Sequence, residues 1–257
     1  MPEHCLAERD GHILTVTMNR PERMNALHTH AHFEMDEIFN DFEADPDLWV
    51  AIVTGAGDKA FSAGNDLKWQ AEGNPTDSPD SGFAGLARRF GMKKPVIGAV
   101  NGLAMGGGFE VALACDIIIA AENAFFALPE PRVGLAALAG GLHRLSRQIP
   151  MKQAMGMILT GRRVMAEEGY KLGFVTEVVP DGEALAGARR WAGLIQECSP
   201  VSIRTSKDVV MRGGDHASVE DAFNADYQSV EDMRNSLDFI EGPLAFSEKR
   251  PPDWKGR

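Results

Sequence analysis

Three consecutive glycines, Gly106-Gly107-Gly108, stand directly before a short apolar stretch that begins at Phe109. Without a Cβ, such residues permit backbone shapes and a close approach of a ligand that other residues forbid. If a helix starts here, its first N–H groups have no partner inside the helix and lie at its positive end, where they can bind an oxyanion. The glycines therefore indicate an oxyanion site, with tight packing of a strand against a helix as the alternative.

Two glutamates, Glu110 and Glu130, are the candidate acid–base residues. Glu110 lies between Phe109 and Val111 in an otherwise apolar turn, and burial raises the pKa of a carboxylic acid towards the range useful for proton transfer. Glu130 lies between two prolines in residues 128–131, and these restrict the backbone and fix its direction. The ordinary alternatives are a first-turn glutamate favoured by the helix dipole and a loop carboxylate.

A dinucleotide-binding fingerprint matches only loosely. It requires G-x-G-x-x-G after a strand and an acid roughly twenty residues further on. Gly106, Gly108 and Glu130 fit this pattern, but Val111 occupies the position of the third glycine. A nicotinamide-binding oxidoreductase is therefore a weaker alternative.

Two further patterns are also weak matches to known sites. Residues 60–64 resemble the G-x-S-x-G nucleophile elbow except at the first position, and no order of strand, helix and His143 supports a catalytic triad. His28, His30 and His32 alternate near a helix start, where only the outer two share a face. Because no third ligand is nearby, we expect solvated histidines and no metal site.

The composition narrows the class of protein. With 257 residues, 44% of them hydrophobic, the chain can bury a sizeable core as one large domain or as one domain with an appendage. A formal net charge of −11 argues against a nucleic-acid partner, because phosphate neutralisation dominates such binding. An anionic small ligand then requires a locally basic site.

The cysteines and the N-terminal residues indicate the compartment. Cys5, Cys115 and Cys198 are an odd number without a CxxC pair, so we expect no disulfide framework. The first ten residues lack the apolar core of a signal peptide, and no run approaches the ~20 apolar residues that span a bilayer. These features predict a cytoplasmic protein that does not bind membranes.

Strands and helices alternate along the first part of the chain. A spacing of three to four residues between apolar side chains predicts a helix from Leu27 to near Pro46, and short β-branched or apolar runs predict strands. This mixture predicts an α/β fold with a strand-strand-helix rhythm. The predicted strands are residues 13–18, 49–54, 95–100, 116–120, a stretch from 125, and 174–179.

The rest of the chain is mainly helical. Turn-forming residues in 69–82 predict a surface loop that could act as a lid. A soft boundary near residues 198–200 separates the mixed core, residues 1–198, from a helical region, residues 199–257. The predicted helices are residues 109–115, 142–149, 151–159, 183–198, 202–211 and 218–246.

Several motifs occur in order over essentially the whole chain. They are residues 19–27, 60–67, 94–102, 106–110, 115–117, 129–130, 159–161 and 246–250. Together these segments resemble the crotonase superfamily, also called the enoyl-CoA hydratase/isomerase family. The resemblance implies a crotonase-type spiral of strand-strand-helix units, and a C-terminal helical region through which homotrimers, or dimers of trimers, assemble.

The same resemblance implies roles for four residues. The backbone amides of Asn65 and Gly107 form an oxyanion hole for the thioester carbonyl, and fixed donors of this kind stabilise developing enolate charge. In hydratases of this family two glutamates flank the double bond of the substrate. Here Glu110 activates the water that adds to the β-carbon, and Glu130 supplies a proton to the α-carbon.

Coenzyme A is implied as part of the substrate, and no bound cofactor or metal is expected. Its cationic contacts supply the basic site that an acidic protein needs for a polyanion. Phe246 and Lys249 are expected to contribute from a neighbouring subunit. The implied contacts in total are Arg23, Met24, Ala26, Ala63, Gly64, Asp66, Leu67, Leu138, Phe246 and Lys249.

One segment departs from the hydratase pattern. Ala137-Leu138 stands where many hydratases have Pro-Gly, at a place where a backbone amide helps to hold the catalytic water, and Arg132 stands where an apolar residue is usual. The leading prediction is a 2-enoyl-CoA hydratase. The alternatives are an enoyl-CoA isomerase, an acyl-CoA hydrolase, a carnitinyl-CoA type dehydratase, and a non-catalytic acyl-CoA binding subunit.

Overall fold

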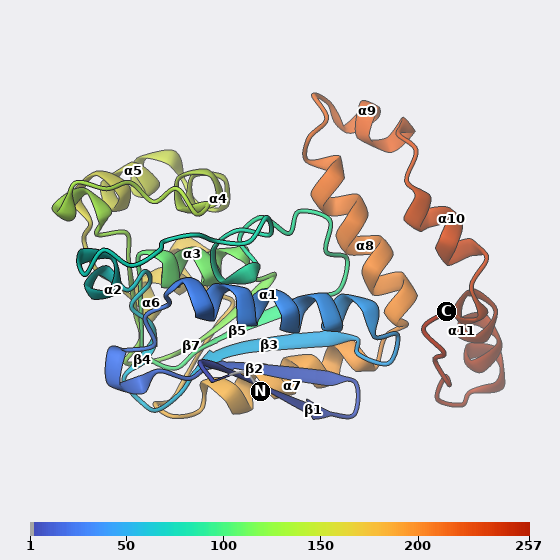
Figure 1. The fold of residues 1–257 in the computed structure, drawn as a ribbon. Helices are drawn as coiled ribbons and strands as arrows, with labels where there is room; N and C mark the ends of the chain where they lie inside the picture. The colour runs from blue at the N-terminus through green and yellow to red at the C-terminus, as the bar shows by residue number, and fades with distance from the viewer. Residues whose placement is uncertain (1–2) are drawn as a thin grey trace.

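A six-stranded sheet forms the centre of the structure, a computed structural model that describes residues 3–257 (Figure 1). The strands lie in the order β1-β2-β3-β5-β7-β10. Only the edge pair β1 and β2 is antiparallel, and the other neighbours run parallel. The strands are β1 (Cys5–Asp10), β2 (Ile13–Met18), β3 (Val50–Gly55), β5 (Val96–Val100), β7 (Ile117–Ala121) and β10 (Glu177–Val179).

The predicted strands are confirmed in the parallel part of this sheet. β2 has the predicted bounds, and β3, β5 and β7 differ from the predictions by no more than one residue at either end. The strand predicted for residues 174–179 is shorter. Phe174 and Val175 instead donate their N–H groups to the carbonyl of Gly169, because they continue the turn that closes the preceding helix at Gly173.

Helices cover both faces of the central sheet, which explains why its strands are nearly all apolar. Figure 1 shows α1 (Thr29–Ala44) on one face and α7 (Ala184–Gln196) on the other. Side chains alternate between these faces along each strand. Thus Val50 and Ile52 belong to the core beneath α7, whereas Ala51 and Val53 belong to the larger core on the α1 side.

A smaller sheet leads directly to the residues with candidate chemistry. Its strands are β4 (Ala60–Ser62), β6 (Leu103–Met105), β8 (Phe125–Ala127) and β9 (Val164–Met165). β6 ends just before Gly106, and β8 ends shortly before Glu130. Since β6 and β8 are parallel neighbours, their carboxyl ends bring these two positions to the same edge.

The predicted strand-strand-helix rhythm is confirmed by the order of the elements. β3 and β4 precede α2, β5 and β6 precede α3, and β7 and β8 precede the turn η3 and then α4. The residues between α2 and η2 form no helix or strand, as predicted for most of residues 69–82. These elements are α2 (Leu67–Ala71), η2 (Phe83–Gly85), α3 (Gly107–Ala114), η3 (Glu130–Val133), α4 (Gly141–Gln148), α5 (Met151–Thr160) and α6 (Ala166–Leu172).

The C-terminal helices form an arm that extends away from the two sheets (Figure 1). The prediction of one helix over residues 218–246 is wrong, since the chain is divided there into three. The side chains of Ser218 and Ser236 accept N–H bonds from Asp221 and Phe239, so each serine starts a new helix. The helices of the arm are α8 (Pro200–Gly213), α9 (Val219–Asn224), α10 (Gln228–Arg234) and α11 (Leu237–Glu248).

The division at residue 198 between a core and an oligomerisation region stays a prediction, although it coincides with the turn between α7 and α8. Within residues 3–257, no helix is both long and apolar enough to cross a membrane.

Candidate active site

The glycine run forms the turn between β6 and α3. Gly106 has φ +53°, a region that favours glycine, and it precedes the first turn of α3. A Cβ on Gly107 would collide with the ring of Phe83, and one on Gly108 would collide with the carbonyl of Ser62. The predicted tight packing is therefore present, and the turn also opens a helix as predicted.

Two backbone amides lie close together at this turn. A Cβ built on Gly64 would lie 2.7 Å from the nitrogen of Gly107, so the chain before Asn65 approaches the start of α3. Leu27 pairs with the residues on either side of Asn65, through Gly64 and Asp66. In the described part of the chain, the N–H groups of Asn65 and Gly107 donate to no protein acceptor. They are thus available to an oxyanion.

Glu110 is a buried carboxyl group with a defined orientation. It lies in the first turn of α3 and is only 3% exposed. Its Oε1 accepts a hydrogen bond of 2.8 Å from the N–H of Gly141 at the start of α4. Burial raises the pKa of Glu110 to about 7; the N–H groups of Gly141 and Ala139 oppose this rise, and the charge of Glu130 adds to it.

Glu130 completes the pair of carboxyl groups. Its Oε1 lies 3.2 Å from the position that a Cβ on Gly106 would occupy. Its Oε2 is the one buried side-chain nitrogen or oxygen without a hydrogen-bond partner in residues 3–257. Burial raises the pKa of Glu130 above its ordinary value. A buried polar atom of this kind is costly unless a water molecule or ligand satisfies it.

The fold thus brings four sequence-predicted residues to one place. The charge of Glu130 acts on Glu110, and both residues lie beside the glycine turn that carries the amide of Gly107. Asn65 joins them from the segment after β4. Chemically, the arrangement offers two hydrogen-bond donors for a developing negative charge and two carboxyl groups whose pKa values burial raises, as suits proton transfer.

Leu138 does not have a free amide to hold a water molecule. Its N–H donates to the carbonyl of Ala136, at 2.8 Å, and its side chain is 77% exposed. The amides that face Glu110 belong to Ala139 and Gly141. The sequence signal for Gly141 is the Gly140-Gly141 pair just before α4, where Gly140 has φ +111° and ends the loop.

The residues proposed to contact coenzyme A fall into two groups. One group lies along the segments that flank the oxyanion turn, where Ala63 donates its N–H to the carbonyl of Met24. Asp66 is occupied structurally, because it caps α2 and forms an ion pair of 3.0 Å with Arg20. The exposed or half-buried members of the group are Arg23, Met24, Ala63 and Leu67, and the buried ones are Ala26, Gly64 and Asp66.

The second group, Phe246 and Lys249, belongs to the arm. Figure 1 places α11 at the opposite end of the molecule from α2, α4 and α5. Phe246 is 88% exposed and Lys249, just after α11, is also exposed. Within one chain, these two residues are therefore not brought to Glu110 and Glu130.

The rejected alternatives have structural explanations. Ser62 is fully buried and its hydroxyl donates to the carbonyl of Asn25, whereas His143 is exposed on α4. The prediction of solvated histidines is correct for His30 and wrong for His28 and His32. His28 caps α1 by accepting the N–H of Ala31, and buried His32 accepts the N–H of Ala84.

Two structural partners of the site were not identified from the sequence. Phe83 packs its ring against Gly107, and Arg144 is among the charges that influence Glu110. Both lie outside the glycine and glutamate motifs, in segments that reach the site only through folding. No group of three or more His, Cys, Asp or Glu residues that could hold a metal ion is found in the described part of the chain.

Comparisons with known proteins agree with the motifs. A sequence profile described as enoyl-CoA hydratase/isomerase matches residues 8–257. The carnitinyl-CoA dehydratase of Escherichia coli strain K12 is 45% identical over 263 aligned residues, which cover all of both chains. Another carnitinyl-CoA dehydratase, from Salmonella arizonae, is 44% identical with the same coverage.

Solved structures extend this similarity to the fold. The crystal structure of an enoyl-CoA hydratase from Mycobacterium tuberculosis H37Rv is 35% identical, with a TM-score of 0.94 over all of both chains. That of a carnitinyl-CoA hydratase from Mycobacterium avium is 38% identical, with a TM-score of 0.79 over 99% of each chain. The α/β crotonase-type fold predicted from the motifs is confirmed, and the chain belongs to the enoyl-CoA hydratase/isomerase family of the crotonase superfamily.

Proposed function

We propose that this enzyme of the crotonase superfamily adds water across the 2,3-double bond of a 2-enoyl-CoA thioester and catalyses the reverse dehydration. The observation that carries the proposal is the pair of buried carboxyl groups, Glu110 and Glu130, beside two free backbone amides. Isomerases and hydrolases require different proton transfers or a different bond cleavage. Two facing acid–base groups suit the addition and removal of water across a double bond.

The amides of Asn65 and Gly107 bind the thioester oxygen in this proposal. As the oxygen of water bonds to the β-carbon, negative charge moves to the thioester oxygen and gives an enolate. Fixed N–H donors stabilise this charge without reorganising, and the loss of one such donor typically costs about 2.7–4 kcal/mol. Because the donors are backbone groups, a side-chain deletion at Asn65 leaves its N–H in place.

The two glutamates move the protons. Ionised Glu110 accepts a proton from water while the oxygen of that water bonds to the β-carbon. Protonated Glu130 then donates its proton to the α-carbon, which completes the 3-hydroxyacyl thioester. One proton has moved from Glu130 to the product and one from water to Glu110, so a proton transfer from Glu110 to Glu130 restores the starting state.

Binding of coenzyme A is assigned to the first group of contacts described above, with Arg23 as the phosphate partner. Phe246 and Lys249 complete the binding site from a neighbouring subunit of a homotrimer or a dimer of trimers. Their exposure and their distance from the glutamates of the same chain support this assignment. We place the enzyme in the cytoplasm.

A carnitinyl-CoA substrate is the second candidate, favoured by relatives of that name at 44–46% identity over the whole chain. The carnitinyl group is a 3-hydroxyacyl group with a trimethylammonium substituent, so its dehydration uses the same two carboxyl groups. The two candidates therefore differ in the acyl substituent and share the chemistry. Only the residues around the distal end of the acyl group distinguish them.

The experiment is an assay of the purified enzyme with crotonyl-CoA, longer enoyl-CoA thioesters and the trimethylammonium analogue crotonobetainyl-CoA. Loss of enoyl-thioester absorbance, with a 3-hydroxyacyl-CoA as product, is expected for at least one of them. A shifted double bond would instead identify an isomerase, and free thiol a hydrolase. Tight binding of coenzyme A without turnover across the panel would indicate a non-catalytic subunit.

A further inference from the structure

Arg144 links the two segments that enclose the carboxyl group of Glu110. It lies in the first turn of α4, where its backbone N–H donates to the carbonyl of Gly140, at 2.8 Å. Its guanidinium folds back over the same residue, so that a Cβ on Gly140 would collide with Nη1. Arg144 therefore packs against the turn whose next amide, that of Gly141, binds Glu110.

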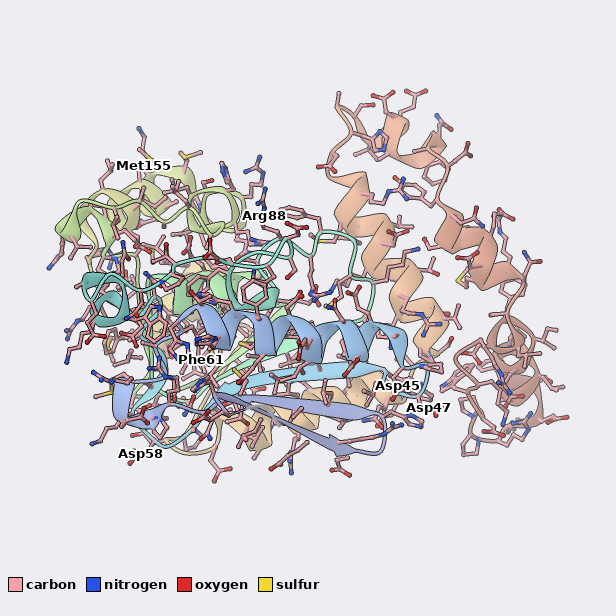
Figure 2. The ribbon with its side chains drawn as sticks, in the orientation of Figure 1. Asp45, Asp47, Asp58, Phe61, Arg88 and Met155 are labelled. Atoms are coloured by element: carbon pink, nitrogen blue, oxygen red, sulfur yellow. The ribbon has the colours of Figure 1, made fainter. Side chains whose placement is uncertain are left out.

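The other end of the guanidinium holds the segment after η2. Nη2 of Arg144 donates a hydrogen bond of 2.8 Å to the carbonyl of Ala87, and the guanidinium lies 5.6 Å from the ring centroid of Phe90. Figure 2 shows this segment, marked by Arg88, passing between α4 and α1. One half-buried cation thus joins the start of α4 to a residue that lies 57 positions earlier in the sequence.

The segment that Arg144 holds, residues 83–90, also packs behind the oxyanion turn and is called the wall of the site below. It carries Phe83, whose ring leaves no space for a side chain at Gly107. On its far side, Arg89 pairs with Asp36 of α1 at 2.6 Å, and the N–H of Ala84 donates to His32. The wall is therefore fixed to α1 on one side and to α4, through Arg144, on the other.

Charge couples Arg144 to Glu110 as well. The charged groups that face Glu110 are Glu130, which raises its pKa, and Arg144, which lowers it. In return, Arg144 faces the buried thiol of Cys115 and the carboxyl group of Glu110. Arg144 is thus the cation that opposes the rise in pKa that burial causes at Glu110, the proposed general base.

We propose that Arg144 is a positioning residue for Glu110: its guanidinium holds the 139–141 turn so that the amide of Gly141 faces the carboxylate. The inference rests on the proposed function in assigning Glu110 as the base. It differs from that proposal in that Arg144 does not touch the substrate. Its effect is transmitted through the turn and through the electric field at Glu110.

The first test compares Arg144→Met and Arg144→Lys with the wild-type enzyme by the pH dependence of kcat in the hydration direction. In Arg144→Met, kcat is expected to fall about tenfold or more, and the acid limb is expected to move to higher pH with little change in KM. Arg144→Lys keeps the charge and loses the planar fork, so it should lower kcat and leave the acid limb near its wild-type position. The matched control is Arg147→Met on the same helix, where the exposed guanidinium only reaches the carbonyl of His143.

The second test does not depend on turnover. The difference in unfolding free energy between chains with and without Glu110→Gln is measured against pH, once in the wild-type background and once with Arg144→Met. The transition in this difference reports the pKa of Glu110, and it should lie at higher pH with Arg144→Met. Equal transitions in the two backgrounds, or equal acid limbs for the Lys and Met variants, would overturn the inference. If no thioester is turned over, the proposed function fails, and this second test still decides the role of Arg144.

Discussion

The N–H of Gly141 donates a 2.8 Å hydrogen bond to Oε1 of Glu110, across 31 residues of sequence. This bond joins the start of α4 to the first turn of α3. A Cβ at position 141 would lie only 3.0 Å from the same oxygen, so a side chain there would press against the carboxyl group. The proposed general base is therefore oriented by the backbone of another helix. This arrangement and the packing around it lead to five predictions.

Replacement of Glu110 by Gln is expected to lower kcat for hydration by about 10²–10⁴-fold, because the amide cannot accept the proton of water. The side chain still offers an oxygen to Gly141, so the fold and the affinity for coenzyme A should be retained. Kinetics and calorimetric titration with coenzyme A measure the two quantities. Wild-type turnover in this variant would remove Glu110 from the mechanism.

Glu130→Gln is expected to lower kcat for hydration by a similar factor, because the α-carbon then has no proton donor. Exchange of the α-proton of a 3-hydroxyacyl-CoA product in D₂O should stop as well. The double variant Glu110→Gln, Glu130→Gln should be little worse than either single one, since the two groups act as a unit. Full activity in the double variant would contradict the assigned mechanism.

The hydration rate should depend on pH through Glu110. Burial raises its pKa to about 7, and the base must be ionised to act. Below that pH, kcat is therefore expected to fall by about tenfold for each pH unit. A pH profile with no acid limb between about pH 6 and 8 would show that Glu110 does not limit the reaction.

The free energy of unfolding should also depend on the ionisation of Glu110, and the raised pKa fixes the direction of the change. The pKa of Glu110 is raised from 4.5 to about 7 in the folded state, so the folded chain holds this proton more tightly than the unfolded chain. The stability that Glu110 contributes is therefore lost as pH rises from about 4.5 to about 7, by up to about 3 kcal/mol. Glu110→Gln should remove this loss, which denaturant unfolding at pH 4 and pH 8 measures. An unchanged difference between the two pH values would contradict the buried, ionisable state of Glu110.

Gly107→Ala is expected to destabilise the protein by about 1–3 kcal/mol, because the new methyl group collides with the ring of Phe83. It should also lower kcat by displacing the amide that we propose binds the thioester oxygen. Gly156→Ala is the matched control in α5, where a Cβ meets nothing within 4 Å and helix propensity favours alanine by about 1 kcal/mol. Thermal unfolding and kinetics measure both effects.

A second variant tests the steric reason. Adding Phe83→Leu to Gly107→Ala should recover part of the lost activity by making space for the methyl group. If activity stays equally low, the backbone geometry of Gly107, rather than the contact with Phe83, would be the cause.

Much of the fold was predictable because local patterns reflect local structure. β2, β3, β5 and β7 are runs of apolar or β-branched residues bounded by turn residues, and both faces of the parallel strands are covered. Strand β1 was not predicted, because its residues after Cys5 are mostly exposed and polar. It exists through its antiparallel pairing with β2, which is a long-range property of the backbone.

The candidate site was likewise predictable only in part. The sequence by itself determined which residues are candidates for the chemistry, since the three glycines, Glu110 and Glu130 have types and spacings that restrict the backbone or place an acid among apolar neighbours. Only the tertiary structure decided that Gly141 rather than Leu138 faces Glu110. It also decided that His32 is buried, and that Arg144 contacts both the segment after η2 and the turn before α4. The physical reason is that hydrophobic periodicity describes the environment of one element, whereas hydrogen bonds and charges act between elements that packing brings together from distant parts of the chain.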